Sequence, residues 1–536
     1  MYKVLQIKVT NNKGFPWYIK NNIYVKGFIY SSDNILYEND NLCNYFIPAT
    51  NIQEFISRVS RANGLFSVII ELDNSVLAAV DRLRTFPLFY TRPSKNIIIS
   101  DNPEEVISSE NLFKTNPHNE KEFLSAGIVC GKNTLINDLY QVQAGACIKM
   151  TAHSVDQIFY HSYVTDTVST KSYNDLSQEF QEILYPVFKR FIDSLAGRTV
   201  LLSLSGGYDS RLIAVMLKIL NYNDVICYSY GDPNNKERSI SQTVAQKLGY
   251  QWQFIDYKKV VHNNYINDPA FKDYYPYAAN YTSMFFLEQY FAVKYLKDSH
   301  TIPGDAVFCA GHSGDFLGGS QLIKNGNIKE QASIDKIARS ILKIKFSQYK
   351  IDKQNKNIFL ENIRESIQNS IINPKSLAYS IFENWDLKEK LAKFIFNSAV
   401  VYNFFGYEHR LPLMDNALVD FFKILPYKFK LYKRLYDDVL KQVFFKPYNL
   451  NFENELQPTK NQIFLQNFKN RIYPYMPSSW HAMNRLKNDY IYHSQITDVL
   501  TRDAEKDGYQ IKLSGKTFNP IIMQWYLHQV RKKFLM

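Results

Sequence analysis

The amino-acid sequence predicts an α/β protein with two domains of different architecture, residues 1–165 and 175–536. At 536 residues the chain is longer than one hydrophobic core usually supports. Its first part is rich in short strands, whereas its second part alternates helix and strand before it becomes mainly helical beyond residue 330. A glycine-rich turn follows a buried strand near residue 205, and such turns open helices in parallel α/β sheets.

Short runs of β-branched and aromatic residues, divided by polar turns, predict the strands of the first domain. These runs lie at residues 1–10, 23–29, 66–72, 76–80 and 97–100. Apolar residues at helical spacing predict a helix over 52–59. The polar stretch 165–172 predicts a linker to the second domain.

The second domain is expected to begin with a helix that extends to about residue 195. The expected strands are 199–205, 225–230, 252–256 and 305–310, and the expected helices between the first three are 211–220 and 237–248. This βαβαβ order predicts a doubly wound parallel sheet, whose ligands bind at the carboxyl ends of the strands.

Composition narrows the class of protein. A hydrophobic content of 46% and a charged content of 21% are typical of soluble globular chains, and no apolar run approaches the roughly 20 residues that span a bilayer. The five cysteines are dispersed without Cys-x-x-Cys pairs, which favours reduced thiols, a cytoplasmic location and no zinc site. The net charge of +12 permits nucleic-acid binding, but the basic residues are spread along the chain and indicate a solvated surface.

The segment Ser203-Leu-Ser-Gly-Gly-Tyr-Asp-Ser210 predicts a phosphate-binding loop. Gly206 and Gly207 let the backbone approach an anion, Ser205 and Ser210 add hydroxyl donors, and the following helix adds its positive N-terminus. Asp209 would repel a phosphate unless a metal ion lay between them, so the loop predicts Mg²⁺ bound together with ATP. The plainer alternative is a turn whose glycines serve only the chain reversal.

Two further segments are expected at the same edge of the sheet. Tyr230 and Gly231 end a strand in a turn suited to contacts with the base or ribose of a nucleotide. In the loop 311–320, Asp315 is a second candidate metal ligand opposite Asp209, because two carboxylates holding Mg²⁺ offset the charge of a leaving pyrophosphate. The alternative for this loop is a tight glycine turn with Asp315 as a helix cap.

Together these segments resemble the asparagine synthetase family, the amide-forming branch of the pyrophosphate-loop (PP-loop) ATPases. Residues 205–210 match its Ser-Gly-Gly-x-Asp-Ser, residues 237–249 look like its following helix, and 408–415 are similar to its Glu-x-Arg-x-Pro-Phe-Leu-Asp. Residues 63–68 and 81–90 look like segments of its glutaminase domain. The resemblance implies an N-terminal Ntn-hydrolase-like αββα sandwich followed by a PP-loop synthetase domain.

The same resemblance implies site residues. Lys460 falls where the family carries a lysine that stabilises the adenylation transition state, and Lys433 or Lys441 could take that role instead. Glu408 and His312 are candidate general bases that would deprotonate a substrate amine together. The alternatives are a polar histidine that fixes its loop, and a salt-bridged helix start at residues 407–415.

The chain also departs from the family. Tyr2 stands where a working glutaminase of this kind carries its cysteine nucleophile, so glutaminase activity is expected to be absent. The loop Gly311-His-Ser-Gly-Asp315 replaces the family's Gly-Glu-Gly-x-Asp-Glu, which indicates a substrate other than aspartate.

The sequence therefore predicts an ATP-dependent, AMP-forming amide synthetase, a carbon–nitrogen ligase that joins ammonia or an amine to a small-molecule or peptide carboxylate. Within the family, ring closure as in β-lactam or lasso-peptide synthesis and amidation of a surface-glycan sugar acid stay open. A tRNA-modifying PP-loop ATPase is the alternative that the positive charge suggests, and a catalytically dead scaffold is another.

Overall fold

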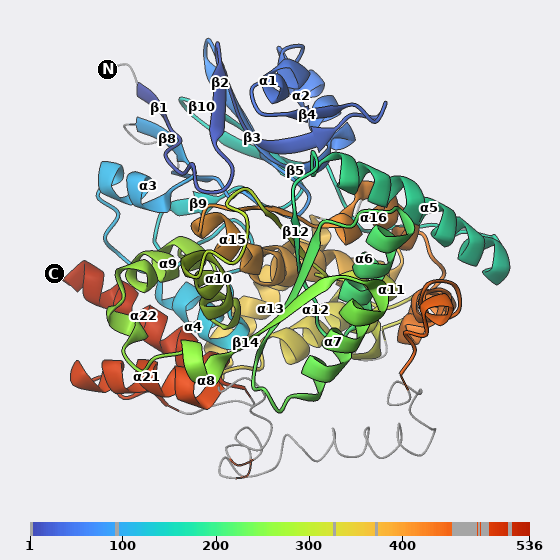
Figure 1. Cartoon of the computed structure of the whole chain (residues 1–536). Coiled ribbons are helices and arrows are strands. Elements are labelled where there is room, and N and C mark those ends of the chain that lie inside the picture. The colour runs from blue at the N-terminus through green and yellow to red at the C-terminus, as the bar shows by residue number, and fades with distance from the viewer. Residues whose placement is uncertain are drawn as a thin grey trace.

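This α/β protein has mainly antiparallel sheets in its N-terminal part and a parallel sheet in its second part (Figure 1). The computed structural model describes residues 4–91, 96–324, 328–369, 373–452, 493–512 and 517–535, together with Trp480 and Met483. Among these residues, no helix combines the length and the apolar character that a membrane crossing requires.

The N-terminal part contains a smaller and a larger sheet. The smaller sheet has the order β1 (Val4–Lys8), β8 (Asn96–Ser100), β7 (Phe89–Thr91) and β9 (Leu139–Gln141). The larger has the order β11 (Val155–Phe159), β10 (Ala146–Thr151), β6 (Ser75–Val80), β5 (Asn63–Leu72), β3 (Ile23–Tyr30) and β2 (Trp17–Lys20), with β4 (Leu36–Glu38) beside β3. Neighbouring strands are antiparallel except β1 and β8, which are parallel.

Alternation along the strands of the larger sheet explains this packing. Val68 faces the helices α1 (Asn41–Phe46) and α2 (Ile52–Arg61), whereas its neighbour Ile69 faces the smaller sheet. On the other side of the smaller sheet, α3 (Pro103–Glu110) packs against β7 and β8. The predicted strands at 23–29, 66–72, 76–80 and 97–100 and the predicted helix at 52–59 are confirmed.

The second part is built on a parallel sheet with the order β14 (Gln251–Asp256), β13 (Val225–Gly231), β12 (Val200–Ser203), β15 (Val307–Ala310) and β16 (Glu408–Arg410). The chain moves outward from β12 to β14 and then returns to the other side of β12 with β15. This reversal creates a topological switch point between β12 and β15, where open α/β sheets bind ligands at the carboxyl ends of their strands.

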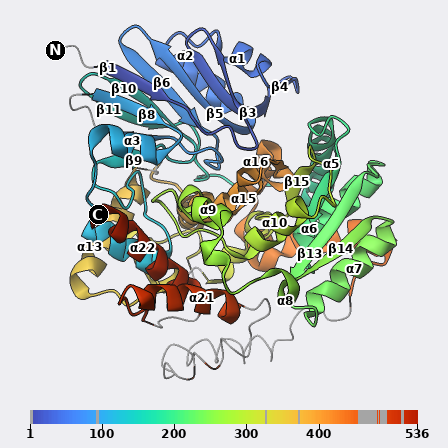
Figure 2. The same cartoon turned by 60° about the vertical axis from the view of Figure 1, so that its left-hand side comes forward.

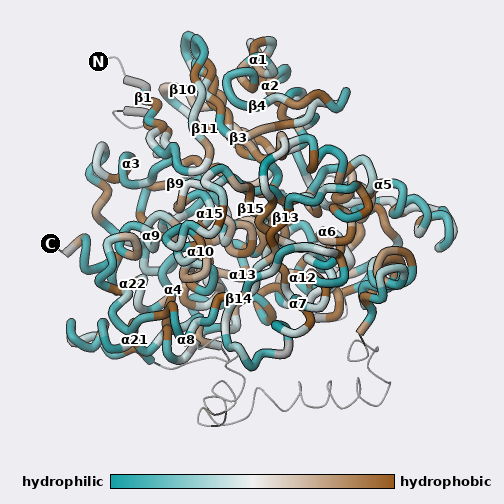
Figure 3. The backbone as a smooth tube through the Cα atoms, in the orientation of Figure 1, coloured by the Kyte–Doolittle hydropathy of each residue, from teal (hydrophilic) through white to brown (hydrophobic). Residues whose placement is uncertain are grey.

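The central strands β12 and β15 are hydrophobic and mostly buried, as expected where both faces of a sheet are covered, and Figure 3 shows the centre of the fold in brown. Cys227 and Cys309 lie fully buried on β13 and β15. Helices of this part include α5 (Tyr173–Asp193), α6 (Tyr208–Ile219), α7 (Lys236–Leu248), α8 (Tyr257–Val260), α9 (Pro269–Ala279) and α10 (Glu288–Asp298).

The remaining chain is mainly helical, as predicted. Its helices are α11 (Gly314–Gly318), α12 (Ile334–Lys345), α13 (Lys353–Gln368), α14 (Ala378–Asp386), a π-helical segment (Leu387–Ile395), α15 (Val400–Phe404), α16 (Asn416–Lys423), α17 (Tyr427–Lys430), α18 (Arg434–Val439), α21 (His493–Lys506) and α22 (Asn519–Leu535). Helix α22 lies beside α4 (Pro117–Ala126) of the N-terminal part, on the side of the molecule that Figure 2 turns forward.

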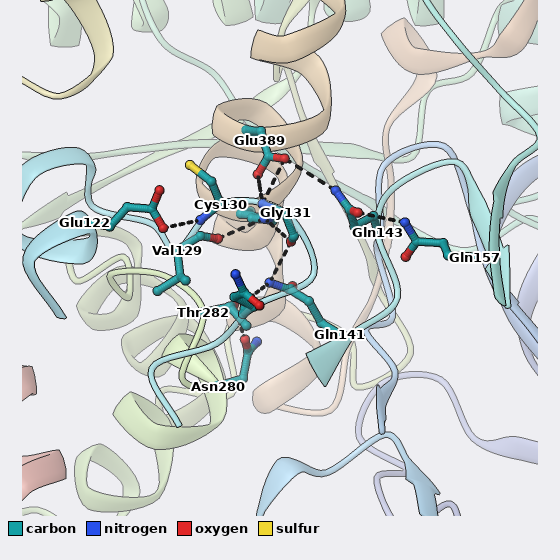
Figure 4. Close-up of polar contacts among 12 residues, drawn as sticks. Glu122, Val129, Cys130, Gly131, Gln141, Gln143, Gln157, Asn280, Thr282 and Glu389 are labelled. Atoms are coloured by element: carbon teal, nitrogen blue, oxygen red, sulfur yellow. Dashed lines mark hydrogen bonds and ion pairs between the residues drawn. The ribbon is translucent and has the colours of Figure 1, made fainter. Parts of the chain in front are cut away.

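A buried polar junction also joins the two parts (Figure 4). Glu389, which is 1% exposed, accepts hydrogen bonds from the Gly131 amide at 3.0 and 3.1 Å, and from Gln143 at 3.5 Å. The fully buried Lys393 ammonium bonds to the Val129 and Gly131 carbonyls at 2.9 and 2.7 Å and to Glu389 at 2.5 Å. The buried charges of Glu389 and Lys393 each have several partners, and these contacts fix the loop at residues 129–131 to the π-helical segment.

Candidate functional site

The predicted phosphate loop connects β12 to α6 at the switch point. Its hydroxyls hold the turn: Gly207 donates its amide to Ser205 Oγ at 3.1 Å, and Ser205 donates its amide to Ser210 Oγ at 3.2 Å. Gly207 is the N-cap of α6 and supplies no side-chain cap, and both Ser205 and Gly207 are exposed. Among the described residues, Gly207 gives the start of α6 no side-chain cap, and the turn lies at an exposed surface, where the N-terminus of a helix can bind an anion.

The loop after β15 approaches the phosphate loop as closely as glycine permits. A Cβ atom on Gly311 would lie 2.7 Å from the Ser210 amide nitrogen, and one on Gly314 would lie 2.7 Å from Asp209 Cγ. Larger residues at either position would push the loops apart. The glycines of residues 311–314 thus bring together the ends of β12 and β15.

Asp209 and Asp315 meet between these loops. The Asp315 amide donates to Asp209 Oδ2 at 2.9 Å, the Tyr436 hydroxyl donates to Asp209 Oδ1 at 2.9 Å, and Ser320 Oγ donates to Asp315 Oδ2 at 2.9 Å. Burial, and then the charge of Asp315, raise the pKa of Asp209 to about 7. Two carboxylates held together in this way favour a cation between them.

The described residues contain no group of three or more histidine, cysteine, aspartate or glutamate side chains able to hold a metal ion. A cation at Asp209 and Asp315 would therefore need further oxygen ligands from a bound molecule or water. Mg²⁺ is commonly bound by one or two carboxylates together with phosphate oxygens, so this donor set fits Mg²⁺ bound with a nucleotide.

Of the two candidate lysines that the structure describes, Lys433 is the one whose charge acts on Asp209. Lys433 packs against Gly318 of the second loop, forms an ion pair with Asp437 at 3.2 Å, and its charge acts to lower the pKa of Asp209. Lys433 and Lys441 each place an ammonium 5.4 Å from the ring centre of Tyr208. Lys460 lies outside the described residues.

The backbone at Lys433 is unusual and firmly held. Tyr432 and Lys433 are consecutive left-handed residues, with φ of 61° and 56°. Just before them, the Lys430 ammonium pairs with Glu383 at 2.7 Å where both side chains are fully buried, and Gln321 donates to the other oxygen of Glu383 at 2.6 Å. This buried pair links the strained turn to the chain that follows the second loop.

His312 follows β15 at the carboxyl end of the strands. The side chain is half-buried, its Nε2 lies 3.3 Å from Ser398 Oγ, and its buried Nδ1 has no hydrogen-bond partner among the described residues. Burial lowers the pKa of His312 to about 4, so the imidazole is neutral near pH 7. The contact with Ser398 is what we expect of a histidine that fixes its loop, and the ring is neutral.

Glu408 is not brought to this site. It pairs in register with Val307, the first residue of β15, whereas the phosphate loop and His312 follow the last residues of their strands. The Glu408 carboxylate forms ion pairs with Arg198 at 3.1 Å and with Arg410 at 2.9 Å. Glu408 is thus separated from His312 by the length of strand β15. Its ion pairs agree with the alternative interpretation of residues 407–415 as a salt-bridged segment.

Tyr230 and Gly231 lie at the end of β13, next to the phosphate loop. The Tyr230 ring stacks on Tyr257 with centroids 5.3 Å apart, and Gly231 has a φ of 114°. A Cβ atom on Gly206 would meet the first turns of α7 at 3.5 Å. These elements lie beside the phosphate loop, and nucleotide binding by Tyr230 and Gly231 stays a prediction.

Sequence reasoning missed Tyr436, which holds Asp209, and the Lys430–Glu383 pair. Tyr436 lies three residues beyond Lys433 in α18, and no motif marks it. A tyrosine among the many of this chain gives no signal of its own. Comparison with protein-family models gives no match for this chain, and comparison with curated proteins gives none either.

Proposed function

We propose that this protein is an ATP-dependent, AMP-forming amide synthetase that activates a carboxylate and transfers it to ammonia or an amine. The observation that carries the proposal is the direct contact of Asp209 with Asp315 at the switch point, beside the N-terminus of α6. The helix–sheet–sheet–helix layering of the N-terminal part, with the parallel sheet after it, supports the resemblance to the asparagine synthetase family.

In the proposed reaction, an oxygen of the substrate carboxylate attacks the α-phosphorus of ATP. The bond from that phosphorus to the bridging oxygen of the β-phosphate breaks, and pyrophosphate leaves. The amine nitrogen then attacks the carbonyl carbon of the acyl-adenylate, AMP departs, and the nitrogen loses a proton. Two steps of this kind exchange a poor leaving group, hydroxide, for AMP.

Each residue has a defined part in this scheme. The amides at the start of α6, with Ser205 and Ser210, bind phosphate oxygens. Asp209 and Asp315 would hold Mg²⁺, which offsets the charge of the pyrophosphate. Lys433 offers a positive charge for the transferring phosphoryl group, a role that Lys460 shares as a candidate. The neutral His312 can accept the proton that the amine loses.

The test is ATP–pyrophosphate exchange with ammonium chloride and a panel of carboxylates: aspartate, glutamate, glucuronate and galacturonate. We expect exchange with a member of the panel, and a loss of more than about 100-fold in Asp209→Ala, because removal of a preorganised charge contact costs about this much. Asp224→Ala is the matched control, since Asp224 precedes β13 at the opposite edge of the sheet, where its carboxylate accepts a hydrogen bond from the Thr199 hydroxyl.

Binding gives a readout that does not depend on the carboxylate. Calorimetric titration with α,β-methylene-ATP and Mg²⁺ should show one binding event that Asp209→Ala removes and Asp224→Ala keeps. Failure of the unaltered chain to bind this analogue would contradict the proposal, whatever the panel shows.

A further inference from the structure

A cavity lies away from the switch point. Its volume is about 740 Å³, and it is enclosed by loops of the N-terminal part, by α9 and by α22, three segments that lie together in Figures 1 and 2. One lining residue, Asn403, donates to the Tyr407 carbonyl just before β16, so the cavity lies toward the amino ends of the parallel strands. The cavity therefore lies toward the opposite ends of the parallel strands from Asp209 and Asp315.

Aromatic side chains form much of the cavity wall. They come from the N-terminal part, from the end of α9 and from α22, and are Phe86, Phe89, Tyr275, Tyr277, Tyr281 and Tyr526. A volume in this range and a wall of this kind suit a small molecule with a planar ring, because rings stack on or meet edge-on with such walls.

A buried positive charge lines the same cavity. Lys26 is 2% exposed, and among the described residues its ammonium has one hydrogen-bond acceptor, the Asn11 carbonyl at 2.5 Å. The nearby Asp101 carboxylate already accepts from the Thr10 and Asn11 amides at 2.9 and 3.1 Å and from the Trp17 indole at 2.6 Å. Lys26 therefore keeps donor capacity that these contacts leave unused.

Burial lowers the pKa of Lys26 to about 8, so the side chain is still mainly an ammonium at pH 7. A buried ammonium gains most from an anionic acceptor, because charge-assisted hydrogen bonds are about twice as strong as neutral ones. At the exposed mouth, Lys13 adds a second ammonium, 4.0 Å from the ring centre of Phe404. Both charges favour an anion.

Part of the wall is held in an unfavourable backbone conformation. Asn280 and Tyr281 are consecutive left-handed residues, with φ of 40° and 59°. The Tyr281 amide donates to the Tyr526 hydroxyl at 3.2 Å, its own hydroxyl donates to Glu104 at 2.6 Å, and Lys533 bonds to Glu104 at 2.5 Å. Strain fixed by three separate elements is typical of a preformed binding surface.

We propose that this cavity binds a small aromatic carboxylate, with the ring against the tyrosine wall and the carboxylate on Lys26. The site is separate from the one proposed for amide synthesis and serves a second ligand.

The test is calorimetric titration of the full chain at pH 7 with three aromatic carboxylates: 4-hydroxybenzoate, 3-phenylpropionate and indole-3-acetate. We expect at least one to bind, and its uncharged alcohol counterpart to bind about 10-fold or more weakly, the value of one charge-assisted hydrogen bond. Lys26→Met should cause the same loss, whereas Lys20→Met, which removes an exposed lysine of β2, should cause none.

Val530→Trp keeps the test decisive if Lys26→Met does not fold. Val530 lines the cavity from α22, and an indole in its place would fill part of the space and abolish binding. Absence of binding by all three acids, equal affinity for acid and alcohol, or unchanged affinity in Val530→Trp would each overturn the proposal. Asp209→Ala should leave this binding intact, so failure here and failure of the proposed ATP chemistry are distinguishable.

Discussion

Asp209→Asn should stabilise the protein, and should do so more at pH 8 than at pH 5. Asp209 is half-buried beside Asp315, and its pKa is raised to about 7, compared with about 3.9 for an unfolded aspartate. Between these two values the folded chain binds a proton that the unfolded chain has lost. Stability from this group is thus highest below about pH 4 and falls as the pH rises to about 7.

The size of the effect follows from the same values. Each tenfold change in proton affinity is worth about 1.4 kcal/mol, so the ionised carboxylate costs about 4 kcal/mol at pH 8 and about 1.5 kcal/mol at pH 5. Asparagine also loses the hydrogen bond from the Asp315 amide, worth about 1 kcal/mol, but this loss is the same at both pH values. The gain at pH 8 should exceed the gain at pH 5 by about 2 to 3 kcal/mol.

Scanning calorimetry measures this difference. With an unfolding entropy of about 2.1 cal/mol/K per residue, the additional gain corresponds to a rise in Tm of about 2 °C for this chain. Asp73→Asn, which alters an exposed carboxylate in the turn between β5 and β6, should shift Tm equally at both pH values. A shift for Asp209→Asn that does not depend on pH, or a lower Tm at pH 8, would refute the argument that Asp209 is held as a costly charge.

Two other substitutions test how the site is built. Gly311→Ala should abolish binding of α,β-methylene-ATP, because its Cβ would meet the Ser210 amide at 2.7 Å. Gly304→Ala, where nothing lies within 4 Å of the new Cβ, should leave binding unchanged. Equal binding by both variants would contradict the close approach of the loops. Lys430→Met should lower the free energy of unfolding by about 3 to 5 kcal/mol, because it leaves the buried Glu383 carboxylate without its cation. Chemical denaturation measures this loss, and adding Glu383→Leu to the same chain should restore much of it. If Lys430→Met alone is as stable as the unaltered chain, the pair carries no structural role.

The sequence predicts most strands of this fold because their periodicity is a local property. The buried run at 199–205 and the alternating run at 66–72 both become strands, and the glycine-rich loop lies where its motif predicts. Helix α6 begins at Tyr208, earlier than the predicted residue 211, because the polar residues of the motif form its first turn.

Other features depend on contacts between distant segments, which no local pattern encodes. The sequence predicts that Glu408 and His312 act together on a substrate amine. The segment of Glu408 is instead the strand β16, which places Glu408 at the amino end of the sheet. The contact of Tyr436 with Asp209 joins residues 227 positions apart, and the strained turn at Tyr432 is held by buried partners from elsewhere in the chain.

The packing of α22 against α4 has a consequence for synthesis of the chain. Arg531 bonds to Glu120 across 411 residues, and Phe123 meets Tyr526 with ring centroids 5.9 Å apart. At about 5 to 20 residues per second, α22 leaves the ribosome roughly 20 to 80 seconds after α4. During that interval the apolar face of α4 is not covered by α22. Chaperone binding to nascent chains should therefore concentrate on α4 and end when α22 emerges.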